Sequence, residues 1–235
     1  SGDWSSDVCS SDLPMKHHIF LNPLTWSTQQ THNHLLKLNK DEQQQAKIYT
    51  HPLRLRAFVA SRLMLKQALN LLNNTQQDWL FAKDQGRLII RYPAVKWYIS
   101  LTHSDDYLAC LLSPQPYCGV DLEQRMYKTR FLAIAKRFFA IDEFLHLNTL
   151  AEDQAFICFL DWWTRKEACI KAWHVGIAHH LNSIVFNPSQ LCPIRYPQQF
   201  EHIPLQLHTI SSPHLQIACA VNDINPEWFV HHLTL

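Results

Sequence analysis

Hydrophobic and polar positions follow two different periods along the chain, and each period predicts a different kind of element. Apolar residues recur every three or four positions over 53–72 and 153–174, which predicts two long helices, one in each half of the chain. Shorter runs rich in branched and aromatic residues, bounded by turn residues, predict strands. This mixture predicts an α+β fold. Strands are expected at 18–21, 79–83, 87–90, 98–102, 107–112, 119–123, 183–187, 205–210 and 215–221, and shorter helices after Asn39 and at 131–139.

The order of these elements divides the chain near residue 115. The prolines of Pro114-Gln115-Pro116 interrupt the pattern, after which a strand, helices and further strands follow again. We expect 15–115 to form an N-terminal α+β half and 116–235 a C-terminal α+β half. Residues 1–14 show no apolar periodicity and lack the basic start and apolar core of a signal peptide. We expect them to be a non-native or disordered lead-in.

Composition narrows the classes of function. The chain has 235 residues, of which 47% are hydrophobic and 17% charged, as expected of a folded globular protein, and it has no apolar run of about 18 residues to cross a membrane. A net charge of +1 gives no reason to expect nucleic acid or an anionic membrane as partner. Seven cysteines without a C-x-x-C pair indicate reduced thiols and a cytoplasmic location. With only four glycines, a phosphate ligand would have to be held by side chains and a metal.

Acidic side chains form the candidate site. Asp121 and Glu123 are two apart on a predicted strand, so they project from the same face. Trp163, Glu167 and Lys171 follow one side of a predicted helix at intervals of four. Three carboxylates from two elements suit a hard cation such as Mg²⁺. The spacing also fits ordinary solvated or weakly salt-bridged pairs, and both interpretations remain open at this point.

Several motifs, in order along the chain, resemble those of one enzyme family. Together they are similar to the Sfp-type 4′-phosphopantetheinyl transferases over roughly residues 35–185. In the first half the motifs are Phe58-x-x-Ser61-Arg62-x-x-x-Lys66, Gly86-Arg87 and Thr102-His103-Ser104; in the second they are Gly119-Val120-Asp121-Leu122-Glu123, Arg137-Phe138-Phe139 with Glu143, and Trp163-x-x-Lys166-Glu167-Ala168-x-x-Lys171-Ala172.

The resemblance implies an enzyme of the holo-[acyl-carrier-protein] synthase type. Such an enzyme transfers the 4′-phosphopantetheine arm of coenzyme A to a serine of an apo acyl or peptidyl carrier protein. The reaction depends on Mg²⁺ and releases adenosine 3′,5′-bisphosphate. The implied fold is a pseudo-dimer of two similar α+β halves with the active site in the cleft between them, in a monomeric chain.

The resemblance also assigns roles to residues of this sequence. Asp121, Glu123 and Glu167 match the Mg²⁺ ligands of the family. Glu167 would also help to remove the serine proton, and Lys171 would neutralise the diphosphate or assist the leaving group. The residues expected to contact coenzyme A are Arg54, Arg56, Arg62, Gly86, Arg87, Thr102, His103, Ser104 and Lys171.

Three departures from the family pattern bear most on the expected function. Asp105 stands where a glycine is usual, and His174 and Val175 stand where Gly-Lys is common. These changes bring an acid near an anionic ligand and remove a turn residue and a positive charge. The alternative is therefore a degenerate homologue that binds coenzyme A or a carrier protein without transfer. A plain structural or interaction protein, in which the acids and bases are ordinary surface pairs, would show no effect of Mg²⁺ on coenzyme binding.

Overall fold

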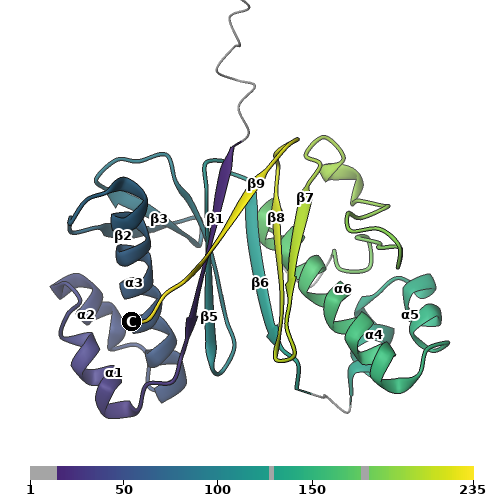
Figure 1. Cartoon of the computed structure of the whole chain (residues 1–235), viewed down its shortest axis with the longest axis horizontal. Helices are drawn as coiled ribbons and strands as arrows, with labels where there is room; N and C mark the ends of the chain where they lie inside the picture. The colour runs from purple at the N-terminus through teal and green to yellow at the C-terminus, as the bar shows by residue number, and fades with distance from the viewer. Residues whose placement is uncertain (1–14, 127–129, 176–179) are drawn as a thin grey trace, which may run out of the picture.

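The computed structural model of the chain describes residues 15–126, 130–175 and 180–235 (Figure 1). The lead-in expected at 1–14 lies outside the described residues. The first half contains β1 (Lys16–Pro23), α1 (Thr28–Leu35), α2 (Lys40–Ala46), α3 (Pro52–Asn73), β2 (Leu80–Asp84), β3 (Arg87–Tyr92), β4 (Tyr98–His103) and β5 (Tyr107–Ser113). It is followed by β6 (Cys118–Gln124), α4 (Phe131–Phe138), α5 (Ile141–Leu147), α6 (Glu152–Trp173), β7 (Gln206–Ser211), β8 (Leu215–Val221) and β9 (Glu227–His232).

Two sheets form the centre of the molecule, and helices cover their outer faces. The first sheet has the strand order β4-β5-β1-β9, and the second has the order β6-β8-β7. Neighbouring strands are antiparallel except β1 and β9, which are parallel. In Figure 1, α1, α2 and α3 lie on one side of the strands and α4, α5 and α6 on the other. This arrangement confirms the predicted α+β fold class.

Strand alternation explains why the core has three parts. One cluster packs α3 against the first sheet and includes Phe20 and Leu65, and another packs α6 against the second sheet and includes Ile170. The third cluster lies between the sheets and includes Ile19 and Val120. Because neighbouring residues of a strand point to opposite faces, Ile19 and Phe20 of β1 enter different clusters.

Local sequence determines where the helices begin and end. Pro52 occupies the first turn of α3, where its missing N–H costs nothing, and the helix ends at Asn74 with a left-handed φ of 48°. The predicted N-cap Asn39 is confirmed, because its side chain accepts a hydrogen bond from the backbone N–H of Glu42 while the Glu42 carboxylate accepts from that of Asn39.

One expected strand needs correction. The strand expected at 183–187 is absent from the described residues except for one isolated bridge, Val185 with Arg195. Backbone N–H groups at the start of this segment bond within a turn to His180, and the side chains of Lys166 and Glu143 bond to Ile184 and Phe186. The last strand, β9, returns to pair in parallel with β1 of the first sheet. The sequence pattern also did not predict α1, α5 or β9.

Among the residues that the structure describes, no helix is long and apolar enough to span a membrane.

Candidate active site

The site forms where β6 passes unusually close to α6. A Cβ atom at Gly119 would overlap the carbonyl oxygen of Ala168 and lie 2.6 Å from the backbone nitrogen of Ala172. These neighbours are backbone atoms of α6 and cannot rotate away. Glycine is therefore required at this point of β6. Because it has no side chain, the strand can approach the helix, and Asp121, two residues further on, lies beside the last turns of α6.

Asp121 and Lys171 form an ion pair across this contact. The Lys171 ammonium nitrogen lies 2.7 Å from Oδ1 of Asp121 and 3.0 Å from the carbonyl oxygen of Val120. The hydroxyl of Thr102, on β4, donates to the same Oδ1 at 3.1 Å. The other oxygen of Asp121, Oδ2, is buried and has no hydrogen-bond partner within the described part of the chain.

Glu167 places a second carboxylate near the first. Its side chain is buried, and its Oε1 atom also lacks a hydrogen-bond partner among residues 15–126, 130–175 and 180–235. The pKa of Glu167 is raised to about 7, mainly by burial and then by the negative charge of Asp121; Lys171 opposes the shift and Glu123 adds to it. The structure thus brings Asp121, Glu167 and Lys171 together and places Glu123 within electrostatic reach.

The carboxylates fit a magnesium ion that is bound by only one or two protein side chains. Among the described residues, no three His, Cys, Asp or Glu side chains converge into a ready-made metal cage. Mg²⁺ does not require one, because it is commonly held by one or two carboxylates and takes its remaining oxygens from water and substrate phosphates. Oδ2 of Asp121 and Oε1 of Glu167 are hard, buried oxygens that receive no hydrogen bond from the residues the structure describes. A cation bound by these two oxygens would balance their negative charge.

Two adjoining hollows extend from Lys171 toward α3. The first, of about 550 Å³, is lined in part by Arg54, Arg62 and His103. The second, of about 410 Å³, is lined in part by Arg87 and Lys171. They share the residues Gly86, Leu88 and Leu101. Anionic groups could therefore extend from Lys171 past the β2–β3 hairpin to the basic residues of α3.

His103 links the two hollows electrostatically. Its pKa is lowered, first by partial burial, then by the positive charge of Lys171 and, more weakly, by that of Arg54, while Ser104 and Asp105 oppose the shift. A bound anion would counteract these cations and favour the protonated ring. The Ser104 hydroxyl oxygen beside it is buried and makes no hydrogen bond to any described residue.

The three arginines predicted to meet the coenzyme have different surroundings. Arg54 and Arg62 both line the first hollow, but the guanidinium of Arg62 is buried over the ring of Phe58 at 4.8 Å and its Nε lies 3.9 Å from Glu42. Burial lowers the pKa of Arg62. Arg56 lines neither hollow. It donates to the carbonyl oxygens of Trp26, at 3.4 Å, and Asp105, so that it ties the loop after β4 to α3.

Two basic residues that line the hollows, Lys83 and His174, were not among the predicted site residues, although the sequence already marked His174 as a departure from the family pattern. Lys83 lines the first hollow, and the only available signal was a basic residue in the hairpin strand just before Gly86. His174 lines the second hollow at the end of α6, with a left-handed φ of 61°. Its ring nitrogens lie 2.9 Å from the carbonyl oxygen of Lys171 and 3.0 Å from that of Pro116. Although His174 stands where glycine is common in the family, it therefore makes the same left-handed turn that a glycine would make.

Two motif residues that carried no assigned role form a buried ion pair instead. The Lys166 ammonium lies 2.7 Å from Oε2 of Glu143 and donates to the carbonyl oxygens of Leu181, at 2.8 Å, and Ile184. Oε1 of Glu143 accepts from the backbone N–H of Phe186 at 2.9 Å. The pair holds the segment where a strand was expected, and it points away from the neighbouring Glu167.

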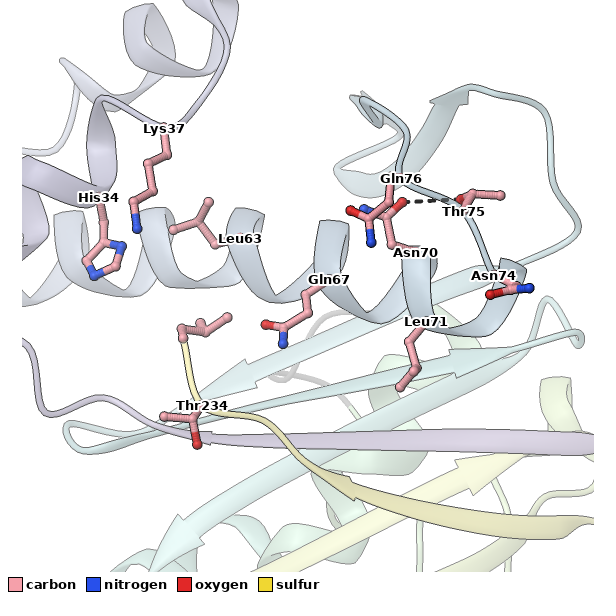
Figure 2. A pocket seen from close by; sticks show the side chains of 11 residues that line it. His34, Lys37, Leu63, Gln67, Asn70, Leu71, Asn74, Thr75, Gln76 and Thr234 are labelled. Carbon is pink, nitrogen blue, oxygen red and sulfur yellow. Dashed lines mark hydrogen bonds between the residues drawn. The ribbon is translucent and has the colours of Figure 1, made fainter.

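A further hollow lies away from this site. It measures about 560 Å³, and Figure 2 shows that it is bordered by α3, by the segment carrying His34 and Lys37, and by the C-terminal segment with Thr234. Asn70 on its wall accepts a hydrogen bond from Thr75 at 3.3 Å. None of the residues that line it is a predicted site residue.

Comparison with known proteins agrees with the geometry. Residues 117–223 match the family model of the 4′-phosphopantetheinyl transferase superfamily. The chain is 27% identical to the 4′-phosphopantetheinyl transferase gsp of Aneurinibacillus migulanus over 61% of this chain and 58% of the relative. It is 28% identical to the 4′-phosphopantetheinyl transferase HetI of a Nostoc species over 68% of this chain and 70% of the relative. It is also 28% identical to the 4′-phosphopantetheinyl transferase psf-1 of Bacillus pumilus, over 57% of each chain.

These alignments are partial: the chain spans about three fifths of the length of the first curated relatives it matches. The matched segment nevertheless contains both β6 with Asp121 and α6 with Glu167 and Lys171, the elements that form the site. The family model and the relatives agree on one class of protein. Residues 117–223, which include the elements of the site, thus match the 4′-phosphopantetheinyl transferase superfamily, and the chain is similar to its members.

Proposed function

We propose that this protein transfers the 4′-phosphopantetheine arm of coenzyme A to a serine of an apo acyl or peptidyl carrier protein, as a holo-[acyl-carrier-protein] synthase. The observation that carries the proposal is the group of Asp121, Glu167 and Lys171. Two of its carboxylate oxygens are buried without a donor from the described residues, beside hollows lined by basic side chains.

The reaction breaks the phosphoanhydride bond of the diphosphate and forms a phosphate ester with serine. The serine oxygen attacks the phosphorus that carries the pantetheine arm, the bond to the bridging diphosphate oxygen breaks, and adenosine 3′,5′-bisphosphate leaves. The serine proton must pass to a base. Glu167 is the candidate for this role, because its buried Oε1 accepts no hydrogen bond from the described residues and is therefore open to a proton.

Lys171 has the position needed to stabilise the leaving diphosphate oxygen. Its ammonium is fixed by Asp121 and the carbonyl of Val120, and its side chain is 30% exposed toward the second hollow. Mg²⁺ held by Asp121 and Glu167, with Glu123 beside them, would neutralise charge on the phosphate oxygens. A preorganised charge at this point costs no reorganisation when the charge of the transition state develops.

For the nucleotide end of coenzyme A we assign the residues around the first hollow. Arg54 and His103 line it, and Ser104 carries a hydroxyl with no partner in the described chain. Gly86 belongs to both hollows, where a side chain would narrow the passage between them. Arg62 would contribute to this site from the wall of the first hollow, and Arg56 would contribute by holding the 103–106 loop in place. We place the enzyme in the cytoplasm, where coenzyme A and carrier proteins are made available to it.

The test is a transfer assay read by mass. The purified chain is incubated with coenzyme A, Mg²⁺ and a panel of apo carrier proteins, and each carrier is weighed before and after. Transfer adds the mass of one phosphopantetheine arm, and a variant of the carrier with alanine in place of its serine gains nothing. If no carrier gains mass while coenzyme A still binds, the chain is a binding homologue without transfer activity. If coenzyme A does not bind at all, the proposal is wrong.

A further inference from the structure

The two sheets meet at β4 and β6, which belong to different sheets and share no backbone ladder. Two hydroxyl groups of β4 bridge the strands instead. The Ser100 hydroxyl oxygen accepts from the backbone N–H of Val120 at 3.0 Å, and the Thr102 hydroxyl donates to Oδ1 of Asp121 at 3.1 Å. Because residues two apart on a strand share a face, one side of β4 reaches both the backbone and the acid of β6.

The two oxygens of the Asp121 carboxylate have unequal surroundings. Oδ1 receives the Thr102 hydroxyl and the Lys171 ammonium, which come from opposite halves of the chain. Oδ2 receives no hydrogen bond from any described residue, although it is buried. Since a carboxylate is planar, two donors on Oδ1 fix the rotation of the group and therefore the direction in which Oδ2 points.

Thr102 itself was expected to contact coenzyme A, but its hydrogen bond opposes that role. A hydroxyl has a single hydrogen to donate, whereas ionised phosphate oxygens only accept. While the Thr102 hydrogen is donated to Asp121 it is not available to a phosphate. Ser104, whose buried hydroxyl has no partner in the described chain, keeps its hydrogen for that purpose.

We propose that Thr102 is a positioning residue for the cation of this enzyme: together with Lys171 it orients Asp121 so that Oδ2 is presented to the metal. The proposal rests on the proposed function, in which Asp121 is a metal ligand. Thr102 is buried and lies in the first half, while Asp121 lies in the second. The hydroxyl therefore couples the relative placement of the two halves to the geometry of the metal site.

The experiment measures metal binding directly. Mn²⁺, used as a probe for Mg²⁺, is titrated into the full chain with coenzyme A present, and its dissociation constant is measured by calorimetry. Thr102→Val keeps the shape but removes the hydroxyl, and it should weaken Mn²⁺ binding about 10-fold, the lower end for losing a group that orients a metal ligand. Thr102→Ser keeps the hydroxyl and should bind Mn²⁺ close to the wild-type affinity.

A matched control is available within the chain. Thr164 is also buried, and its hydroxyl bonds only to the carbonyl oxygens of Leu160, at 3.1 Å, and Asp161, at 3.0 Å, among the contacts described. Thr164→Val should leave the Mn²⁺ affinity unchanged. If Thr102→Val does not fold, Thr102→Ala replaces it in the same comparison with Thr102→Ser.

The outcomes separate this proposal from the proposed function. If the wild type transfers the arm and binds Mn²⁺, but Thr102→Val binds Mn²⁺ equally well, only the role of Thr102 is wrong. The same conclusion holds if Thr102→Val loses affinity for coenzyme A in the presence of a chelator while its Mn²⁺ affinity is unchanged, because the hydroxyl would then belong to the coenzyme site. A wild type that neither binds Mn²⁺ nor transfers the arm overturns both proposals.

Discussion

At the scale of single residues, the site is a balance of buried charges. Asp121 is compensated by Lys171 at 2.7 Å, whereas the buried Glu167 has a pKa raised to about 7. One carboxyl group is therefore paired directly with a cation, whereas burial disfavours the ionised form of the other. Two carboxyl groups in different environments are the usual way in which one site combines charge stabilisation with proton transfer.

Asp121→Asn, Glu167→Gln and Lys171→Ala should therefore differ in their response to magnesium. Each amide substitution keeps the size of the side chain but removes one charged ligand, so we expect transfer to fall roughly 10²-fold, with partial recovery at high Mg²⁺. Lys171→Ala removes no metal ligand, so its defect should persist at saturating Mg²⁺. The measurement is a Mg²⁺ titration of the transfer rate for each variant. Wild-type rates and metal dependence in both amide variants would contradict the carboxylate site.

At the scale of elements, the contact between β6 and α6 is set by one missing side chain. Gly119 allows the strand to touch the helix backbone, while Gly86 is needed for a different reason. Gly86 turns the β2–β3 hairpin with a φ of +82°, and a Cβ there would have no heavy atom within 4 Å beyond its chain neighbours. The first glycine is required by space, and the second by backbone conformation.

This contrast predicts unequal effects of alanine. Gly119→Ala forces α6 and β6 apart, and we expect it to lower the free energy of unfolding by at least about 3 kcal/mol, the upper end for overpacking, because backbone atoms cannot rotate away. Gly86→Ala should cost only about 1 kcal/mol, the strain of a left-handed residue. Urea unfolding of both variants measures the difference. Equal losses would show that the close approach at Gly119 relaxes without cost.

The C-terminal strand β9 is joined to β1 partly through histidines. Nδ1 of His18 lies 3.0 Å from Nε2 of His231, and burial, followed by the charges of His231, His17 and Lys16, lowers the pKa of His18 to about 4. Phe20 and Phe229 stack near the same ring. A charged His18 would therefore be placed among apolar rings and other basic groups.

Acidification should consequently weaken the fold. In the unfolded chain His18 is protonated near its ordinary pKa of 6.5, whereas in the folded chain it is protonated only near its lowered pKa of about 4. Between these values the unfolded state binds more protons, so stability falls as the pH is lowered. We expect the melting temperature to drop from pH 7 to pH 5, and His18→Phe to reduce the drop. The exposed His202, changed to glutamine, serves as the control. An unchanged pH dependence in His18→Phe would exclude this role.

At the scale of the whole molecule, one chain provides both walls of the site. Thr102 and His103 come from the first sheet, Asp121 comes from the second, and Lys171 comes from the helix that covers the second. The apolar cluster between the sheets, with Ile19, Val120 and their neighbours, joins the two halves through buried surface. Nothing in this geometry requires a second copy of the chain to complete the site.

We therefore expect a monomer that is active at any concentration. Sedimentation equilibrium should give the mass of one chain, and the specific transfer activity should not change on dilution, because no residue of the site has to be supplied by a partner. Loss of activity on dilution together with dissociation of an oligomer would contradict the prediction.

The sequence by itself determined the long elements and the acidic centre of the site. Apolar periodicity is a local property, so it located α3 and α6 to within a few residues and most strands with them. Spacing is local as well: residues two apart on β6 and four apart on α6 share a face, which is why Asp121 and Glu123, and separately Glu167 and Lys171, could be grouped before their elements were brought together.

The tertiary structure alone decided which distant groups meet. No local pattern shows that β9 returns to β1, that Thr102 donates to Asp121, or that Lys166 is buried against Glu143 while its neighbour Glu167 faces the site. Nor could spacing distinguish Arg54, which lines a hollow, from Arg56, which holds a loop. These pairings depend on how the two sheets stack and how closely α6 approaches β6, which are set by packing of the whole core rather than by any segment.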